Sequence, residues 1–158
     1  YAGLNPKKVT ARVTRRCYGV GVNDIFEEGV DPLDFKIIRP DGPRCTNRFS
    51  TFVRKGQKVQ MDECVTNSYS AMKVHAMHDF SVRIFAIDGY PPRYTTDTGV
   101  SKLAKISVPN PFKSSDPIGH KVSIIVKMYF GLNEIKVRGF IQGKEYSTIL
   151  RFDGADSY

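Results

Sequence analysis

The chain alternates apolar and polar side chains over many short stretches. In residues 9–14, Val9, Ala11 and Val13 alternate with threonine and arginine, so one side of an extended segment is apolar and the other polar. Seven further runs are rich in β-branched and aromatic residues, which favour strands. These runs are RFSTFV, ECVTNSYS, FSVRIFAI, KLAKISV, KVSIIVKMYF, EIKVRGFI and EYSTILRF. No stretch shows a convincing helical pattern, so the sequence predicts an all-β protein.

Turn-forming residues separate the runs and predict an antiparallel β-sandwich of about eight strands. Asp41-Gly42-Pro43, Asp88-Gly89 and Gln142-Gly143-Lys144 are examples of such turns. The last three runs have two tight connections between them, which indicates a meander. Two segments are poor in strand signal. We expect residues 24–46 to form a long loop and residues 109–119 to connect two sheets.

Length and composition indicate one globular domain that does not span a membrane. The chain has 158 residues, 41% of them hydrophobic. No stretch approaches the roughly 18 consecutive apolar residues of a membrane span. The first residues contain no apolar segment typical of a signal peptide. Cys17, Cys45 and Cys64 are odd in number and far apart, which suits a reducing compartment, and no Asn-x-Ser/Thr sequon occurs. We therefore expect a cytoplasmic protein.

The net charge of +8 leaves an anionic partner open. The basic residues are spread over the chain, and no basic helix or RNA-recognition motif is present, so the sequence does not favour nucleic acid as a partner. The nearest thing to a basic cluster, residues 7–16, keeps an anion-binding or nucleic-acid-binding sandwich as a lesser alternative.

The candidate catalytic and metal-binding patterns are weak. The two glycines of YGVGV are not followed by a helix and a Gly-Lys-Ser/Thr ending, so they do not predict a phosphate loop. His75, His78 and Asp79 lie together in KVHAMHDF, but their spacing implies no shared face and indicates an exposed turn. The Cys and His residues are too widely spaced for a zinc site. We expect no enzyme activity, cofactor or metal in this chain.

Several motifs occur in a recognisable order: GLNPKKVTARVTRRCYGVGV, CTNRFSTFVRKGQKV, TTDTGVSKL and FGLNEIKV. Together they resemble the 70 kDa heat shock chaperones, and most closely their divergent protein 12 branch. The resemblance implies a substrate-binding β-sandwich of the chaperone type over residues 17–153. Residues 1–16 would be the end of an ATPase domain and the interdomain linker, and residues 154–158 a tail. We expect the C-terminal helical lid of this family to be absent, because nothing after Phe152 could form one.

The resemblance implies a function and a set of site residues. Such a domain holds extended apolar segments of client proteins in a groove between strand-connecting loops. ATP and magnesium would bind only to the ATPase domain, which would be a partner within the full-length chain. The residues that match linker positions are Val9, Ala11 and Val13. The residues that match groove positions are Val20, Tyr69, Met72, Val82, Ile84 and, if the register slips by one from Glu134, Ile135.

The glycines of YGVGV would then begin a strand beside the groove, because glycine permits close backbone approach. The main alternative is a non-chaperone adaptor module, in which the sandwich is kept and its own side chains or the long loop fill a degenerate groove. A cavity at the groove position would distinguish the two interpretations.

Overall fold

The computed structural model describes residues 11–61, 63–75, 79–131 and 134–151. This part of the chain contains eleven strands, one short 3-10 helix and no α-helix. The elements are β1 (Ala11–Val13), β2 (Cys17–Ile25), η1 (Leu33–Phe35), β3 (Lys36–Arg39), β4 (Gly42–Val53), β5 (Lys58–Gln60), β6 (Cys64–Met72), β7 (Phe80–Ile87), β8 (Ser101–Val108), β9 (Lys121–Phe130), β10 (Glu134–Ile141) and β11 (Lys144–Arg151).

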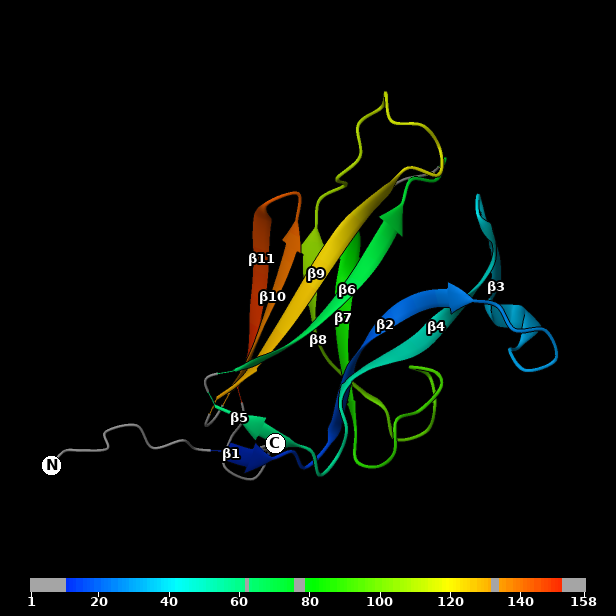
Figure 1. Cartoon of the computed structure of the whole chain (residues 1–158). Helices are drawn as coiled ribbons and strands as arrows, with labels where there is room; N and C mark the ends of the chain where they lie inside the picture. The colour runs from blue at the N-terminus through cyan, green and yellow to red at the C-terminus, as the bar shows by residue number, and fades with distance from the viewer. Residues whose placement is uncertain (1–10, 62, 76–78, 132–133, 152–158) are drawn as a thin grey trace, which may run out of the picture.

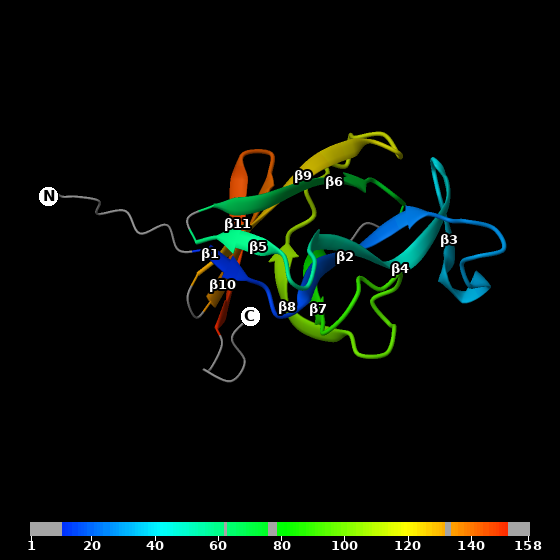
Figure 2. The same cartoon turned by 60° about the horizontal axis from the view of Figure 1, so that its bottom comes forward.

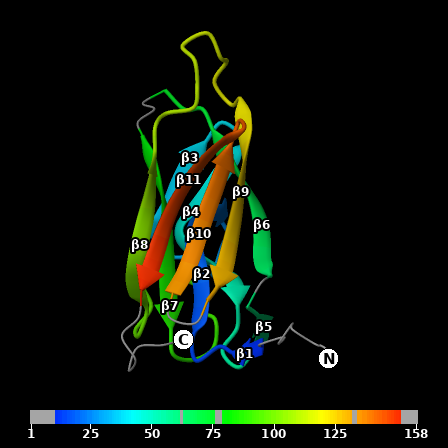
Figure 3. The same ribbon diagram turned by 90° about the vertical axis from the view of Figure 1, so that its left-hand side faces the viewer.

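Two antiparallel sheets pack face to face and form the sandwich (Figures 1 and 3). One sheet has the strand order β3-β4-β2-β7-β8 and the other has the order β11-β10-β9-β6. Figure 3 looks onto the four-stranded sheet, with the five-stranded sheet behind it. The short strands β1 and β5 pair with each other beside the start of β2 (Figure 2). The all-β antiparallel sandwich is therefore confirmed.

Alternation along the strands produces the core. In β9, Val122, Ile124, Val126, Met128 and Phe130 are buried, while the residues between them are exposed or half-buried. β10 repeats this pattern. These side chains pack against inward-facing residues of β2, β7 and β8 in one hydrophobic cluster. Burial of apolar side chains at about 25 cal/mol per Å² is the main stabilising term for such a sandwich.

The connections were predicted with one exception. β9, β10 and β11 are hydrogen-bonded in sequence order, which confirms the meander. The segment between β8 and β9 passes from one sheet to the other, as expected. The prediction of a long loop over residues 24–46 was wrong, because η1, β3 and the first part of β4 lie there. β3 pairs with β4 from Lys36 to Arg39 and extends the five-stranded sheet. The KIIR run is short and lies among prolines and acidic residues, which are rare in strands, so the sequence did not indicate a strand there.

The linker-like segment lies against the sandwich where it is described. In β1, Ala11 pairs with Gln60 of β5 and Val13 pairs with Lys58. The buried Thr14 follows, and its hydroxyl donates a hydrogen bond to the Arg54 carbonyl at 2.6 Å. Val9 lies outside the described residues. The role of this segment as an interdomain linker stays a prediction.

Asp31 anchors the segment between β2 and β3 to the loop between β7 and β8. Its side chain is fully buried, although the residue lies in an irregular segment. Arg93 Nε donates to Asp31 Oδ1 at 3.0 Å, the Tyr94 hydroxyl donates to the same oxygen, and the Glu27 amide donates to Oδ2 at 2.8 Å. The hydrogen bond from Arg93, followed by those from Tyr94 and Glu27, holds the pKa of the Asp31 carboxyl well below its usual range.

We expect Asp31→Asn to lower the melting temperature at pH 7 by several degrees, because a neutral amide loses the charge-assisted hydrogen bonds. A carboxylate with a lowered folded-state pKa stabilises the fold above its unfolded pKa of about 3.9, and this stabilisation is lost as the pH falls further. Thermal unfolding between pH 7 and pH 3 should therefore show a weaker acid dependence for Asp31→Asn than for the wild type. Asp34→Asn, at an exposed position of the same segment, is the control. Equal melting curves for both variants would contradict this role of Asp31.

No helix in the described part of the chain is long and apolar enough to cross a membrane. The three cysteines are free thiols, and Cys17 and Cys45 are buried.

Candidate functional site

β2 and β7 run side by side over only half of their length. They pair from Cys17 to Val20 of β2, opposite Ile84 to Ile87 of β7. Beyond Val20, β2 remains paired with β4 as far as Ile25, and residues 80–83 of β7 remain paired with β8. The two strands thus diverge, and Figure 1 shows β2 and β4 bending away from β7. Each strand here has one edge that no described backbone segment pairs with.

Register shifts explain why the strands diverge. The β2–β4 ladder shifts between Tyr18 and Gly19 and again between Val22 and Asp24. The β7–β8 ladder shifts between Ile84 and Phe85. Such irregularities increase the local twist and bend a strand away from its neighbour.

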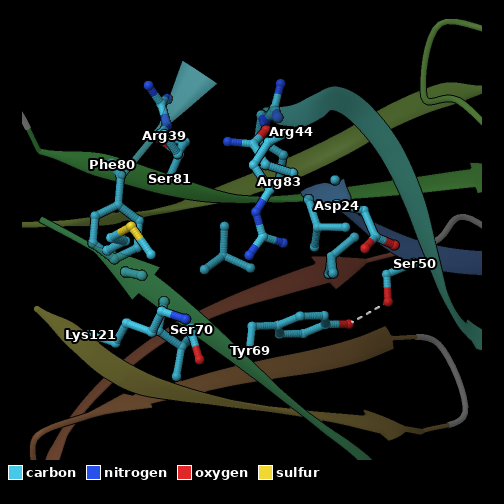
Figure 4. Close-up of a pocket in the computed structure, with 18 of the residues that line it drawn as sticks. Asp24, Arg39, Arg44, Ser50, Tyr69, Ser70, Phe80, Ser81, Arg83 and Lys121 are labelled. Atoms are coloured by element: carbon cyan, nitrogen blue, oxygen red, sulfur yellow. Dashed lines mark hydrogen bonds between the residues drawn. The ribbon is translucent and has the colours of Figure 1, made fainter. Parts of the chain in front are cut away.

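A cavity of about 1080 Å³ lies between the diverging strands. The second sheet contributes the opposite wall through β6 and β9, and the β3–β4 hairpin covers the outer end (Figure 4). Apolar side chains form part of the lining: Val20, Val22, Phe49, Tyr69, Ala71, Met72, Val74, Phe80, Val82 and Ile124. A second hollow of about 410 Å³ shares Asp41, Met72 and Lys121 with this cavity and continues it along the loop before β9.

Tyr69 connects the two sheets at one end of the cavity. Its hydroxyl and the Ser50 hydroxyl, on β6 and β4, are 2.9 Å apart (Figure 4). Asn67 Nδ2 donates to the Tyr69 hydroxyl at 3.4 Å and to the Thr51 carbonyl at 3.3 Å. Burial raises the pKa of Tyr69, so the phenol stays neutral at physiological pH. The ring is therefore a fixed apolar wall with a satisfied polar end.

The glycines of YGVGV have different surroundings. A Cβ on Gly19 would lie 2.4 Å from the Ser50 carbonyl oxygen and 2.5 Å from the Phe49 ring, so no side chain fits there. A Cβ on Gly21 would lie 3.0 Å from the Phe85 ring and 3.2 Å from Arg83 Nη2. Gly19 thus allows close packing of β2 against β4, and Gly21 lines the cavity. The predicted strand beside the site is present.

Every carboxylate that lines the cavity has a partner, whereas two of the four cations that line it have no carboxylate partner among the described residues. Asp41 forms ion pairs with Arg44 and with Lys121, the latter at 3.5 Å. Asp24 lies 4.0 Å from Arg48, and Asp79 accepts a hydrogen bond from the Asn110 amide at 2.9 Å. These contacts leave the remaining lining cations, Arg39 and Arg83, without a carboxylate partner among the described residues.

The structure brings four of the six predicted groove residues to this cavity: Val20, Tyr69, Met72 and Val82. The other two, Ile84 and Ile135, do not line the cavity and are fully buried in the core between the sheets. Val20 lines the cavity, but its side chain is only 1% exposed and belongs to the same core cluster. Ile135 lies near the start of β10, an inner strand of the four-stranded sheet, so the register that replaces Glu134 with Ile135 gives a core position. The peptide-binding role of all six residues stays a prediction.

Sequence reasoning missed the basic side of the site. Arg83 alternates with Val82 and Ile84 in a strand, and alternation alone does not distinguish a solvated arginine from one beside a cavity. Arg39 and Arg44 belong to the hairpin that was expected to be a loop. His75 is exposed, as the turn interpretation predicted, and His78 lies outside the described residues. No group of three or more His, Cys, Asp or Glu residues gathers in the described ranges.

The fold and the site define an antiparallel β-sandwich with a cavity at the point where two strands of one sheet diverge. Comparison with curated proteins finds heat shock 70 kDa protein 12A of Homo sapiens and of Mus musculus, each 30% identical over 135 residues. The match covers 85% of this chain and 20% of each relative, so the chain spans about a fifth of their length. No protein-family model matches the chain, and neither does any solved structure. The chain is thus related to the 70 kDa heat shock protein family, as its motifs predicted.

Proposed function

We propose that this chain is a substrate-binding domain that holds an extended segment of another polypeptide in the cavity between β2 and β7. The observation that carries the proposal is the pair of diverging strands, each with an unpaired edge facing a partly apolar cavity. An extended peptide can add hydrogen bonds to such an edge while its alternate side chains enter pockets. The relation to the heat shock family supports the same function.

The size and lining of the cavity fit a short apolar segment. A volume of about 1080 Å³ exceeds that of one side chain, and the second hollow extends the path for an elongated ligand. Val22 and Val82 offer apolar contacts from the two diverging strands, and Tyr69 and Met72 offer them from the opposite sheet. Burial of one large apolar side chain there contributes about 1.5–3 kcal/mol. The open cavity favours this function over the adaptor with a filled groove.

The proposal extends to the regulation of binding and to the client proteins. In a longer chain, an ATPase domain with ATP and magnesium would regulate binding, and this domain itself would have neither catalysis nor a cofactor. Its clients would be unfolded or flexible cytoplasmic proteins, and not nucleic acids. These expectations rest on the relation to protein 12A, of which this chain covers a fifth.

Binding of a labelled, neutral, apolar heptapeptide tests the proposal. We expect fluorescence anisotropy to rise and saturate as the domain is added, at both low and high salt, because apolar burial is not screened by ions. The same peptide with a proline at every second position is the control, since proline removes backbone donors. A folded domain that shows no saturable binding, or that binds both peptides equally, would contradict the proposal.

A further inference from the structure

Arg83 places a positive charge in the gap between the diverging strands. It lies on β7 one residue after Val82, at the point where pairing with β2 stops. Its Nη2 would be 3.2 Å from a Cβ on Gly21 of β2, so the guanidinium reaches across the gap to the opposite strand. Figure 4 shows this side chain pointing into the cavity. Glycine at position 21 leaves the room that the guanidinium needs.

Arg83 is half-buried and has no ion pair with any residue that the structure describes. Its guanidinium lies over the Phe85 ring, with Cζ 5.8 Å from the ring centroid. A ring contact stabilises a cation modestly and does not satisfy its hydrogen-bond donors. The carboxylates around the cavity already have partners, Asp41 with two cations and Asp79 with a backbone amide. The unused donors of Arg83 therefore face the space that a ligand would enter.

We propose that Arg83 makes this cavity selective for extended segments that carry an Asp or Glu side chain beside an apolar one. The inference rests on the proposed function and adds the substrate class. Arginine binds carboxylates with two parallel hydrogen bonds, which gives both strength and direction. Arg39, at the hairpin end of the same cavity and also without an ion pair in the described residues, adds to the positive potential. Val82 and the half-buried Val22 supply the apolar contact next to this carboxylate position.

A hydrogen-bonded ion pair between Arg83 and a ligand carboxylate predicts a preference for acidic peptides that weakens as the salt concentration rises. A charge-assisted hydrogen bond contributes about 1.5–3 kcal/mol, which corresponds to roughly ten- to hundredfold in affinity. Partial exposure of Arg83 reduces this, so we expect about tenfold at low ionic strength. The apolar contribution persists at high salt, and the carboxylate preference declines.

Three heptapeptides that differ only beside the central apolar residue, with Glu, Gln or Lys there, test the inference. For the wild type we expect the Glu peptide to bind about tenfold more tightly than the Gln peptide, and the Lys peptide to bind more weakly than either. In Arg83→Gln the preference for the Glu peptide should be lost, so that the Glu and Gln peptides bind with equal affinity. Arg83→Lys should keep part of the preference, because it retains the charge and loses the two-pronged geometry. Arg138→Gln, on β10 beside Glu145, is the matched control and should keep the full preference.

The outcomes separate this inference from the proposed function. Equal binding of all three peptides by the wild type would overturn the selectivity and leave peptide binding intact. A Glu preference that survives in Arg83→Gln would overturn the assignment to Arg83. Failure of every peptide to bind would overturn both proposals. Circular dichroism and thermal unfolding verify that each variant is folded.

Discussion

Met72→Asp should reduce the affinity for a neutral apolar heptapeptide by about a hundredfold, through the loss of an apolar contact and the cost of desolvating a carboxylate. Met72 lies at the end of β6 and lines both the main cavity and the second hollow, so a ligand in either space contacts it. The residue is half-buried, and a substitution there leaves the core between the sheets intact. The measurement is the anisotropy titration of the wild type and the variant under the same conditions.

Ile125→Asp is the matched control for Met72→Asp. Ile125 lies on β9, next to the strand that carries Met72, but its side chain is 37% exposed and does not line the cavity. The same change of an apolar residue to an acidic one should therefore leave the affinity for the heptapeptide unchanged. Equal losses in the two variants would indicate a general effect of the added charge and would contradict binding in the cavity.

Gly19→Ala should destabilise the domain by about 3 kcal/mol or more, because overpacking forces neighbouring groups to move. The added methyl would meet the Ser50 carbonyl oxygen at 2.4 Å and the Phe49 ring at 2.5 Å. The backbone of β4 cannot yield without breaking its ladder with β2, which holds the wall of the cavity. For a domain of this size we expect the melting temperature to fall by about 6–12 °C.

Gly139→Ala is the matched control for a strand glycine. The nearest atom to its added Cβ is the Tyr146 carbonyl oxygen at 3.7 Å, an ordinary contact. Alanine should therefore change the free energy of unfolding by less than about 1 kcal/mol, since it loses less backbone entropy than glycine. Thermal and urea unfolding of both variants measure the difference. Equal stability of Gly19→Ala and Gly139→Ala would contradict the close packing of β2 against β4 at Gly19.

The strands with strict alternation could be predicted from the sequence, and the site could be predicted only in part. KVSIIVKMYF and EIKVRGFI have one buried and one outer face, so their patterns determine both strand and orientation. β3 lacks such a signal, because its stability comes from pairing with β4 and not from its own sequence. The resemblance identified Val20 and Val82, but their alternation alone does not distinguish a cavity wall from a core.

The cavity itself could not be predicted, since it depends on register shifts between strands that are far apart in the sequence. The ladder shifts near Gly19 and Asp24 bend β2, and the direction of that bend brings Arg83 and Gly21 to the same space. The positions of Ile84 and Ile135 could not be predicted either, because an apolar side chain fits a groove and a core equally well. Pairing geometry, and not side-chain type, decides which of the two they occupy.

The most direct test of the central claim is an NMR titration of the ¹⁵N-labelled domain with the neutral apolar heptapeptide. If the cavity holds an extended segment, the largest chemical-shift changes should occur at the amides of Gly21, Val22, Ser81 and Val82, where the edges of β2 and β7 face the cavity. The chemical shifts of the β11 amides should not change. Shifts confined to the outer faces of β9, β10 and β11, or no shifts at a peptide concentration that saturates binding in solution, would contradict the assignment of the site.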